Sequence, residues 1–177
     1  MIKKFGVGDV SDHLGRYHDL MATPDFILAL RKKIGSDPLW LSGVTAVVIR
    51  DERVLLAKRA DNGKWTPVTG IIDPGEQPAD AAAREVFEET GVVAVPERLA
   101  MVHVTDPVVY DNGDQARYLD LVFRFAWKSG VPLPADGENT AVGWFQLDDL
   151  PLMSVDMCRR IAAAVSNEPA AQYVVSP

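Results

Sequence analysis

Apolar and polar residues alternate along several stretches of the chain, and this period of two predicts β-strands. The clearest case is residues 118–127, where every second position on one face is a large apolar residue. That face carries Leu119, Leu121, Phe123, Phe125 and Trp127. The other predicted strands are 44–50, 53–59, 64–70, 97–105 and 142–147. The first two of these are predicted to pair through the short connection Asp51-Glu52, and Asn112-Gly113 predicts a turn.

Apolar residues three and four positions apart predict three helices. The first spans 23–34, with Thr23 as its cap, Pro24 at the first helical position and Gly35 as its stop. Its apolar stripe consists of Phe26, Ile27, Leu30 and Ile34. The last spans 154–167 and has Ser154 as its expected cap. Its inner side is predicted to consist of Val155, Cys158, Ile161 and Val165.

The middle helix is rich in glutamate. It is predicted to start at Gln77-Pro78 and to stop at Gly91. At about 100° per residue, Glu85, Glu88 and Glu89 lie within an arc of about 100°. The opposite side, predicted to pack on the sheet, consists of Ala79, Ala83, Val86, Phe87 and Thr90. Arg84 stands four residues before Glu88 and can pair with it.

Strands and helices intermix, which predicts an α/β or α+β fold with one mixed β-sheet. The 177 residues suit one domain with a short extra arm. We expect an N-terminal extension with an amphipathic helix at 1–41, a main domain at 42–167 and a flexible tail at 168–177. We expect the helix of this extension to pack across the subunit boundary of a homodimer.

Charge and cysteine content narrow the function classes. The net charge of −7 argues against binding to a nucleic-acid backbone, which requires a basic surface. The single cysteine, Cys158, allows no internal disulfide. The N-terminus lacks the apolar core of a signal peptide, and no apolar run approaches the length of a membrane span. We therefore expect a cytoplasmic protein without membrane or nucleic-acid partners.

Several carboxylates on one helix face repel one another unless a cation joins them. Oxygen-only ligands favour Mg²⁺ or Mn²⁺ over Zn²⁺. Such an ion typically takes up substrate phosphates and assists the attack of water on phosphorus. The alternative is that the glutamates only form a solvated helix face, as isolated charge runs commonly do.

The full spacing of the segment favours the metal site. Residues 70–92 fit the pattern G-x5-E-x7-R-E-U-x-E-E-x-G-U, in which U is a bulky apolar residue. A match of this kind arises roughly once in 10⁹ random positions. The pattern resembles the Nudix box, and the chain resembles the Nudix hydrolases over about residues 42–165. Unlike many members of that family, this chain has Val68-Thr69 before the first glycine of the box.

The resemblance implies an α/β/α sandwich with a mixed sheet and Mg²⁺-dependent hydrolysis of a nucleoside diphosphate linked to another group. It implies that Glu85, Glu88 and Glu89 bind the metal, with Glu76 as a supporting carboxylate. It further implies that Arg84 orients them and that Gly70 offers a backbone carbonyl. Pro107 lies sixteen residues after Gly91, a spacing similar to that of ADP-ribose pyrophosphatases.

The general base is left open between two glutamates. Glu138, in the loop before the last strand, corresponds to the base of many Nudix relatives, although it also fits a solvated loop acid. Glu88 is the other candidate. Trp65, Tyr110 and Tyr118 can stack on a base, but strand aromatics more often belong to the core.

Two other functions compete with hydrolysis. The first is a Nudix module that binds and senses nucleotides without cleaving them, which we would expect to have lost metal ligands. The second is an isomerase of the isopentenyl diphosphate type, which resembles the same fold and uses a catalytic cysteine near a strand. Because Cys158 falls in the last helix, the isomerase is disfavoured.

Overall fold

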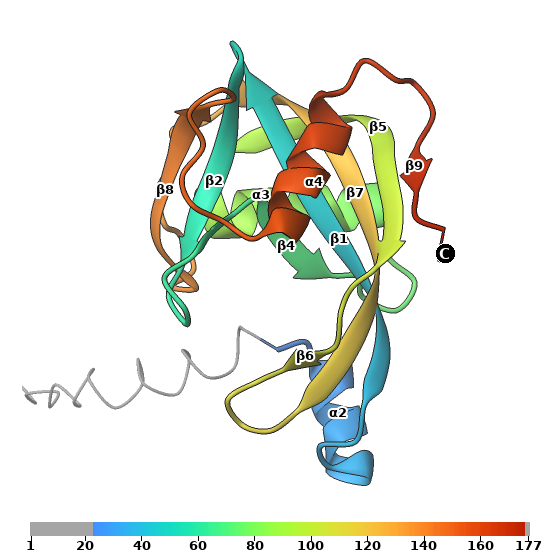
Figure 1. Ribbon diagram of the computed structural model, residues 1–177. Helices are drawn as coiled ribbons and strands as arrows, with labels where there is room; N and C mark the ends of the chain where they lie inside the picture. Colours follow the sequence, from blue (N-terminus) through green and yellow to red (C-terminus); the bar gives the residue numbers. More distant parts are fainter. Residues whose placement is uncertain (1–22, 176–177) are drawn as a thin grey trace, which may run out of the picture.

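The structure is a computed structural model that describes residues 23–175 (Figure 1). Its helices are α2 (Asp25–Ile34), α3 (Pro78–Thr90) and α4 (Val155–Val165). Its longer strands are β1 (Leu39–Arg50), β2 (Arg53–Arg59), β5 (Val93–Val104), β7 (Gln115–Ser129) and β8 (Asn139–Gln146). Its short strands are β3 (Trp65–Thr66), β4 (Val68–Ile71), β6 (Val108–Val109) and β9 (Gln172–Tyr173).

Within residues 23–175, nine strands form one mixed sheet, as the intermixing of strands and helices predicted. Its main order is β3-β2-β1-β7-β5-β9, while β4 pairs with β1, β6 with β7 and β8 with β2. The β1–β7 and β5–β9 pairs are parallel and the others are antiparallel. β4 pairs antiparallel with β1, so Val68-Thr69 continues a regular strand into the box.

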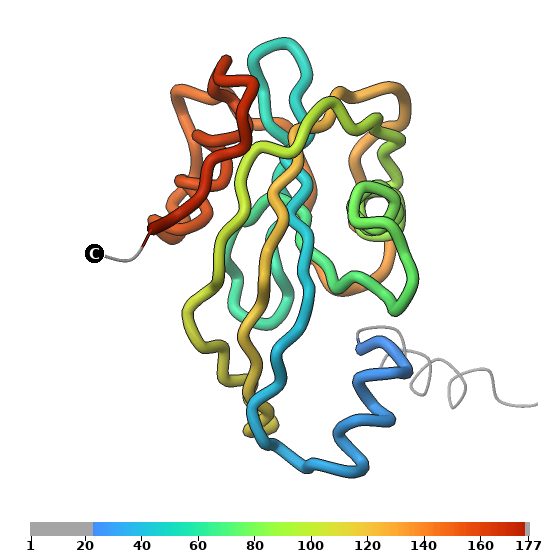
Figure 2. The backbone as a smooth tube through the Cα atoms, turned by 90° about the vertical axis from the view of Figure 1, so that its right-hand side faces the viewer, coloured from blue at the N-terminus to red at the C-terminus, as the bar shows by residue number. Residues whose placement is uncertain are grey.

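Helices α3 and α4 cover opposite faces of the sheet, which gives the predicted three-layer sandwich (Figure 2). Val86 and Ala82 of α3 pack into one core cluster with Phe125 of β7. Ile161 of α4 packs into a second cluster with Val47 and Val122 on the other face. The two cores hold the sheet between the helices, and α3 carries Glu85, Glu88 and Glu89.

The predicted pairing of the first two long strands is confirmed. The connecting residues Asp51 and Glu52 both have positive φ, 48° and 60°, and Arg50 pairs with Arg53. A two-residue connection with two left-handed residues matches the right-handed twist of the flanking strands. Gly113 has a φ of 85°, and the amide of Tyr110 donates to the carbonyl of Asp114, which confirms the Asn112-Gly113 turn.

The predicted inner faces of two helices are partly wrong. Phe87 is 58% exposed, while Ala81 and Ala82 are fully buried beside Val86. In α4, Val155 is 87% exposed and Cys158 is also exposed. The buried positions of α4 are Arg160, Ile161, Ala163 and Ala164. The apolar repeat predicted both helices correctly. In α4, however, the buried face includes Arg160 and therefore differs from the predicted apolar stripe.

Helix α2 near the N-terminus and strand β9 near the C-terminus both contact the main domain. Ile27 of α2 packs with Leu41 and Ala116, and the side chain of Arg31 donates to the carbonyl of Gln115 at 2.7 Å. Pro24, not Thr23, is the residue before the helix, and no side chain caps it. Tail residues 172–173 form β9 against β5, so this part is a strand. Residues 1–22 of the extension lie outside the described part.

Ser154 caps α4 as predicted, because its hydroxyl accepts from the amide of Met157 at 3.2 Å. In the described part of the chain, no helix is long and apolar enough to cross a membrane.

Candidate active site

The loop between β4 and α3 folds back and brings Glu76 next to the helix. The amide of Asp73 donates to Oε2 of Glu76 at 3.2 Å, and the amide of Glu76 donates to the carbonyl of Asp73 at 3.0 Å. Gly75 makes this bend with a φ of 90°, which side chains disfavour. Pro78 and Gly91 then bound α3 as predicted.

Arg84 joins three of the predicted site carboxylates. Its guanidinium donates to Glu76 through Nε at 2.9 Å and through Nη2 at 3.0 Å. Nη1 donates to Glu85 at 2.9 Å and to Glu88 at 3.0 Å. The hydrogen bonds from Arg84 hold the pKa of Glu76 below its usual value, and Glu76 in turn raises the pKa of Arg84. This one cation therefore fixes the geometry of a cluster that would otherwise repel itself.

Glu85 occupies space that only a glycine at position 70 leaves free. A Cβ atom on Gly70 would lie 2.2 Å from Cδ of Glu85 and 2.3 Å from its Oε1. Burial raises the pKa of Glu85 to about 7 against the opposing charge of Arg84, and Glu88 and Glu138 raise it further. The carboxyl group thus lies beside the backbone of β4 at Gly70.

Glu89 is the most deeply buried carboxylate of the box, with 6% of its surface exposed. Nδ2 of Asn139 donates to its Oε2 at 2.8 Å. Burial raises the pKa of Glu89 to about 8, and the charges of Glu138, Glu85 and Asp136 raise it further. The hydrogen bond from Asn139 favours the ionised form but does not outweigh these effects. The carboxyl of Glu89 therefore resists ionisation in this environment.

Glu138 belongs to the same charge cluster. It is half-buried, and burial raises its pKa first, followed by repulsion from Asp136. Arg59 opposes this shift, while Glu88 contributes to it. The structure thus brings Glu138 into electrostatic contact with the box. Its role as general base stays a prediction.

Three contributors to the cluster were missed by sequence reasoning. Asn139 holds Glu89, and Arg59 acts on both Glu89 and Glu138 while it pairs with Asp61 at 2.8 Å. The third is Asp136. Asn139 directly follows Glu138, and Arg59 ends a predicted strand before an Asp-Asn-Gly turn. The sequence thus places Asn139 and Arg59 next to predicted elements, but it does not show that they act on Glu89, which is distant from both in the sequence.

The aromatic candidates divide between core and surface. Trp65 packs edge-on against Phe145, with ring centroids 4.7 Å apart, and belongs to the α4-side core. The hydroxyls of Tyr110 and Tyr118 lie 2.5 Å apart at the lower end of the sheet.

His103 is buried, and its Nε2 contacts Asp120 at 3.1 Å, which is typical of a structural histidine.

The donor set fits a hard divalent cation in its chemistry. The side chains that gather here are carboxylates, and the two most buried of them have raised pKa values. Within residues 23–175, however, no three His, Cys, Asp or Glu side chains are already arranged as a metal cluster. Arg84 instead bridges Glu76, Glu85 and Glu88.

Comparison with known proteins agrees with this geometry. A family model, the NUDIX domain, matches residues 40–163. A MutT-like protein of Streptomyces ambofaciens is 37% identical over 116 residues, which cover 65% of this chain and 70% of that protein. A putative 8-oxo-dGTP diphosphatase of Bacillus subtilis (strain 168) is 39% identical over 125 residues, 69% of this chain and 77% of that protein.

A solved structure extends the likeness of fold beyond the matched domain. The crystal structure of a UDP-X diphosphatase aligns with a TM-score of 0.60 at 22% identity, over 92% of this chain and 81% of that one. The family match spans more than half of this chain, and the box is complete. The chain therefore belongs to the Nudix family and is a hydrolase of pyrophosphate bonds.

Proposed function

We propose that this Nudix hydrolase uses Mg²⁺, or Mn²⁺ in its place, held by Glu85, Glu88 and Glu89. The carboxyl of Glu85 against Gly70 is the observation that carries the proposal, because only a glycine admits it so close to the β4 backbone. Gly70 would add its carbonyl oxygen to the ligands, and Glu76 would support them through Arg84. Hard oxygen donors of this kind suit Mg²⁺.

The protein side chains have distinct tasks in this proposal. A bound divalent cation would supply a more acidic water and offset the charge of the pyrophosphate. Arg84 keeps Glu76, Glu85 and Glu88 in place through four of its hydrogen bonds. Asn139 orients Glu89 from the neighbouring strand.

We assign the general base to Glu138, with Glu88 as the second candidate. A base must be near the attacking water and must hold a pKa near the working pH. Burial and Asp136 raise the pKa of Glu138, and its charge is felt by Glu85 and Glu89. Glu138→Gln should lower kcat about 100-fold or more and remove the acidic limb of the pH–rate profile. A profile unchanged in this variant would move the role to Glu88.

The substrate class is a nucleoside diphosphate linked to another group, of the ADP-ribose or (d)NTP type. The name of the Bacillus subtilis relative and the spacing of Pro107 from the box support this class. We propose a small-molecule substrate and no nucleic-acid partner, because the net charge of −7 opposes backbone binding.

A substrate panel with Mg²⁺ tests this function. It should contain ADP-ribose, nucleotide sugars, dinucleoside polyphosphates, canonical NTPs, oxidised dGTP and a short RNA with a pyrophosphate-linked 5′ nucleoside. We expect cleavage of at least one small molecule and a loss of about 100-fold or more in Glu88→Gln. Glu168→Gln makes the same chemical change at an exposed loop residue and serves as the control. Equal rates in Glu88→Gln and wild type would contradict the proposal.

We also propose a cytoplasmic homodimer. Support comes from the sequence, which has one cysteine, and from α2, which extends the domain beyond the NUDIX match. A solution mass equal to one chain of 19.4 kDa at micromolar concentration would exclude the dimer.

A further inference from the structure

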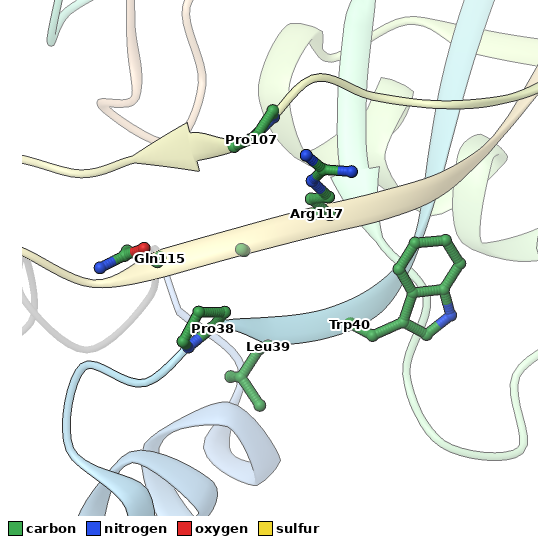
Figure 3. A pocket seen from close by; sticks show the side chains of 7 residues that line it. Pro38, Leu39, Trp40, Pro107, Gln115 and Arg117 are labelled. Carbon is green, nitrogen blue, oxygen red and sulfur yellow. The ribbon is translucent and has the colours of Figure 1, made fainter.

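Two neighbouring cavities at the lower end of the sheet share Trp40. The first, of about 340 Å³, is lined by Pro38, Leu39, Trp40, Pro107, Gln115, Ala116 and Arg117. Figure 3 shows Trp40 and Arg117 on the adjacent strands β1 and β7, with Pro107 beside Arg117. The second, of about 450 Å³, extends from Trp40 toward the box. Trp40 is the lining residue that the two cavities share, and we call the two cavities together the groove; each has the size of a small-molecule site.

The second cavity borders the candidate active site at Glu76. The second cavity is lined by Trp40 and Phe26 on one side and by the loop residues Ile72 to Glu76 on the other. Figure 2 shows α2 and the loop into α3 on the same side of the sheet. Glu76 is the carboxylate that Arg84 ties to Glu85 and Glu88. A molecule whose pyrophosphate lies at the box can therefore extend into this groove.

The walls of the groove combine aromatic surface with unused polar groups. Trp40 is 60% exposed, an unusual share for the largest apolar side chain. Within residues 23–175, the carboxylate of Asp73 and the guanidinium of Arg117 have neither a hydrogen-bond nor an ion-pair partner. A flat ring can stack on Trp40, hydroxyl groups can donate to Asp73, and an anionic or carbonyl group can accept from Arg117.

We propose that this groove is the subsite for a second ring-bearing unit of the substrate, a nucleoside or a sugar attached beyond the pyrophosphate. Trp40 stacks on its ring, Asp73 accepts from its hydroxyls and Arg117 binds its far end. The subsite has this role only if the chain hydrolyses pyrophosphates as proposed above. Substrates with a ring at both ends are then preferred over nucleoside triphosphates.

This subsite also gives the N-terminal extension a role in recognition. Phe26 belongs to α2, which precedes the NUDIX match at residues 40–163. The helix is fixed to the sheet by Ile27 and by Arg31, which pairs with Asp114 at 3.3 Å. The fixed helix holds Phe26 opposite the loop, so the groove has two walls.

Binding without turnover provides the first test. In the presence of a chelator, tryptophan fluorescence is titrated with ADP-ribose, UDP-glucose or NAD, and with ATP. The first three carry a ring-bearing unit at each end of the pyrophosphate and are called two-ring compounds below, whereas ATP carries such a unit at one end only and is called a one-ring compound. We expect the two-ring compounds to quench a component that is absent from Trp40→Leu. Quenching that is identical in Trp40→Leu and wild type would overturn the subsite. The probe that binds best distinguishes a nucleoside from a sugar in the groove.

Steady-state kinetics provide the second test. Trp40→Leu should lower the ratio of kcat/KM for two-ring over one-ring substrates about 10-fold or more, mainly through KM, since stacking on an aromatic residue contributes this much per base. Arg117→Gln should change the same ratio in the same direction. Lys128→Gln, an exposed cation on the same strand β7, should leave the ratio as in wild type.

The outcomes separate this subsite from the proposed function. If wild type cleaves no pyrophosphate, the function itself fails. If wild type cleaves them and both groove variants keep the wild-type ratio, hydrolysis stands and the subsite is wrong. If Trp40→Leu converts a dimer into single chains and leaves KM unchanged, Trp40 belongs to a subunit interface and the subsite is also wrong.

Discussion

At the scale of single residues, the site depends on a missing side chain. Gly70 lies in the regular strand β4, where a glycine normally weakens a strand. Its conformation does not require glycine, because its φ is not positive. The side chain of Glu85 fills the position that a Cβ would take. The first glycine of the box is therefore explained by the space that a carboxylate needs.

Gly70→Ala should remove activity while the protein still folds. The new methyl group meets the flexible end of Glu85 at 2.2 to 2.3 Å, so the carboxylate moves aside and the backbone can stay. We expect kcat to fall about 100-fold, comparable to the loss of a catalytic group, with only a small change in Tm. Gly143→Ala is a matched control, because its Cβ would meet Phe145 at an ordinary 3.7 Å. A fully active Gly70→Ala would show that the position of Glu85 is not critical.

Glu89 makes the metal-free protein sensitive to pH. Its pKa is about 8 in the folded state and about 4.5 in the unfolded state, so the folded chain binds the proton more tightly. The stabilisation is complete below about pH 4.5 and is lost as the pH rises toward 8. With a chelator present, the free energy of unfolding should fall by a few kcal/mol over this range, at about 1.4 kcal/mol per pKa unit.

Urea unfolding at pH 5, 6, 7 and 8 measures this dependence. Glu89→Gln keeps a hydrogen-bonding side chain but cannot ionise, so its profile should be flatter than that of wild type. Saturating Mg²⁺ should also flatten the wild-type profile if Glu89 is a ligand. Parallel profiles for wild type and Glu89→Gln would show that Glu89 does not titrate in this range.

At the scale of elements, a buried polar network fixes α4 to the sheet. Asp120 of β7 lies at its centre and accepts from Thr45 at 2.9 Å and from His103 at 3.1 Å. Arg160 of α4 pairs with Asp120 at 3.2 Å and donates to Thr45 at 2.8 Å. Asp156 holds the outer side of Arg160 at 2.6 Å. Each buried charge thus has a partner, which the low dielectric of the interior demands.

Arg160→Leu should destabilise the fold by about 3–5 kcal/mol, because it leaves the carboxylate of Asp120 buried without its cation. Arg159→Leu provides the control on the adjacent position of the same helix. The Arg159 side chain is 46% exposed, and its pair with Asp156 should contribute at most about 1 kcal/mol. Chemical denaturation of both variants checks the difference. Equal losses would show that the network does not hold α4.

This network also shows where reasoning from sequence ends. The repeat of α4 predicted a helix with the correct cap, Ser154, but chose its apolar side as the inner face. The buried face includes Arg160, because this side chain forms an ion pair with Asp120 of the sheet, 40 residues earlier in the sequence. The local apolar repeat predicts that a helix forms. Which side of the helix is buried depends on residues that are distant in the sequence and meet only in the folded protein.

At the scale of the whole molecule, the sandwich assembles the site from the box and from two segments that are distant from it in the sequence. β4 supplies Gly70, α3 supplies the glutamates, the loop before β8 supplies Glu138, and β2 ends at Arg59. The box was predictable because its spacing lies within 23 consecutive residues. The sequence did not predict roles for Asn139, Arg59 and Trp40, because these roles depend on neighbours that are distant in the sequence.

The central claim is that the α3 carboxylates hold a divalent cation that hydrolysis requires. The initial rate of pyrophosphate cleavage, measured against Mg²⁺ concentration for wild type, Glu85→Gln and Glu168→Gln, tests it most directly. We predict no cleavage with a chelator, and a Mg²⁺ requirement shifted at least 10-fold upward in Glu85→Gln alone. Cleavage that persists in the chelator, or identical Mg²⁺ curves for all three proteins, would contradict the account.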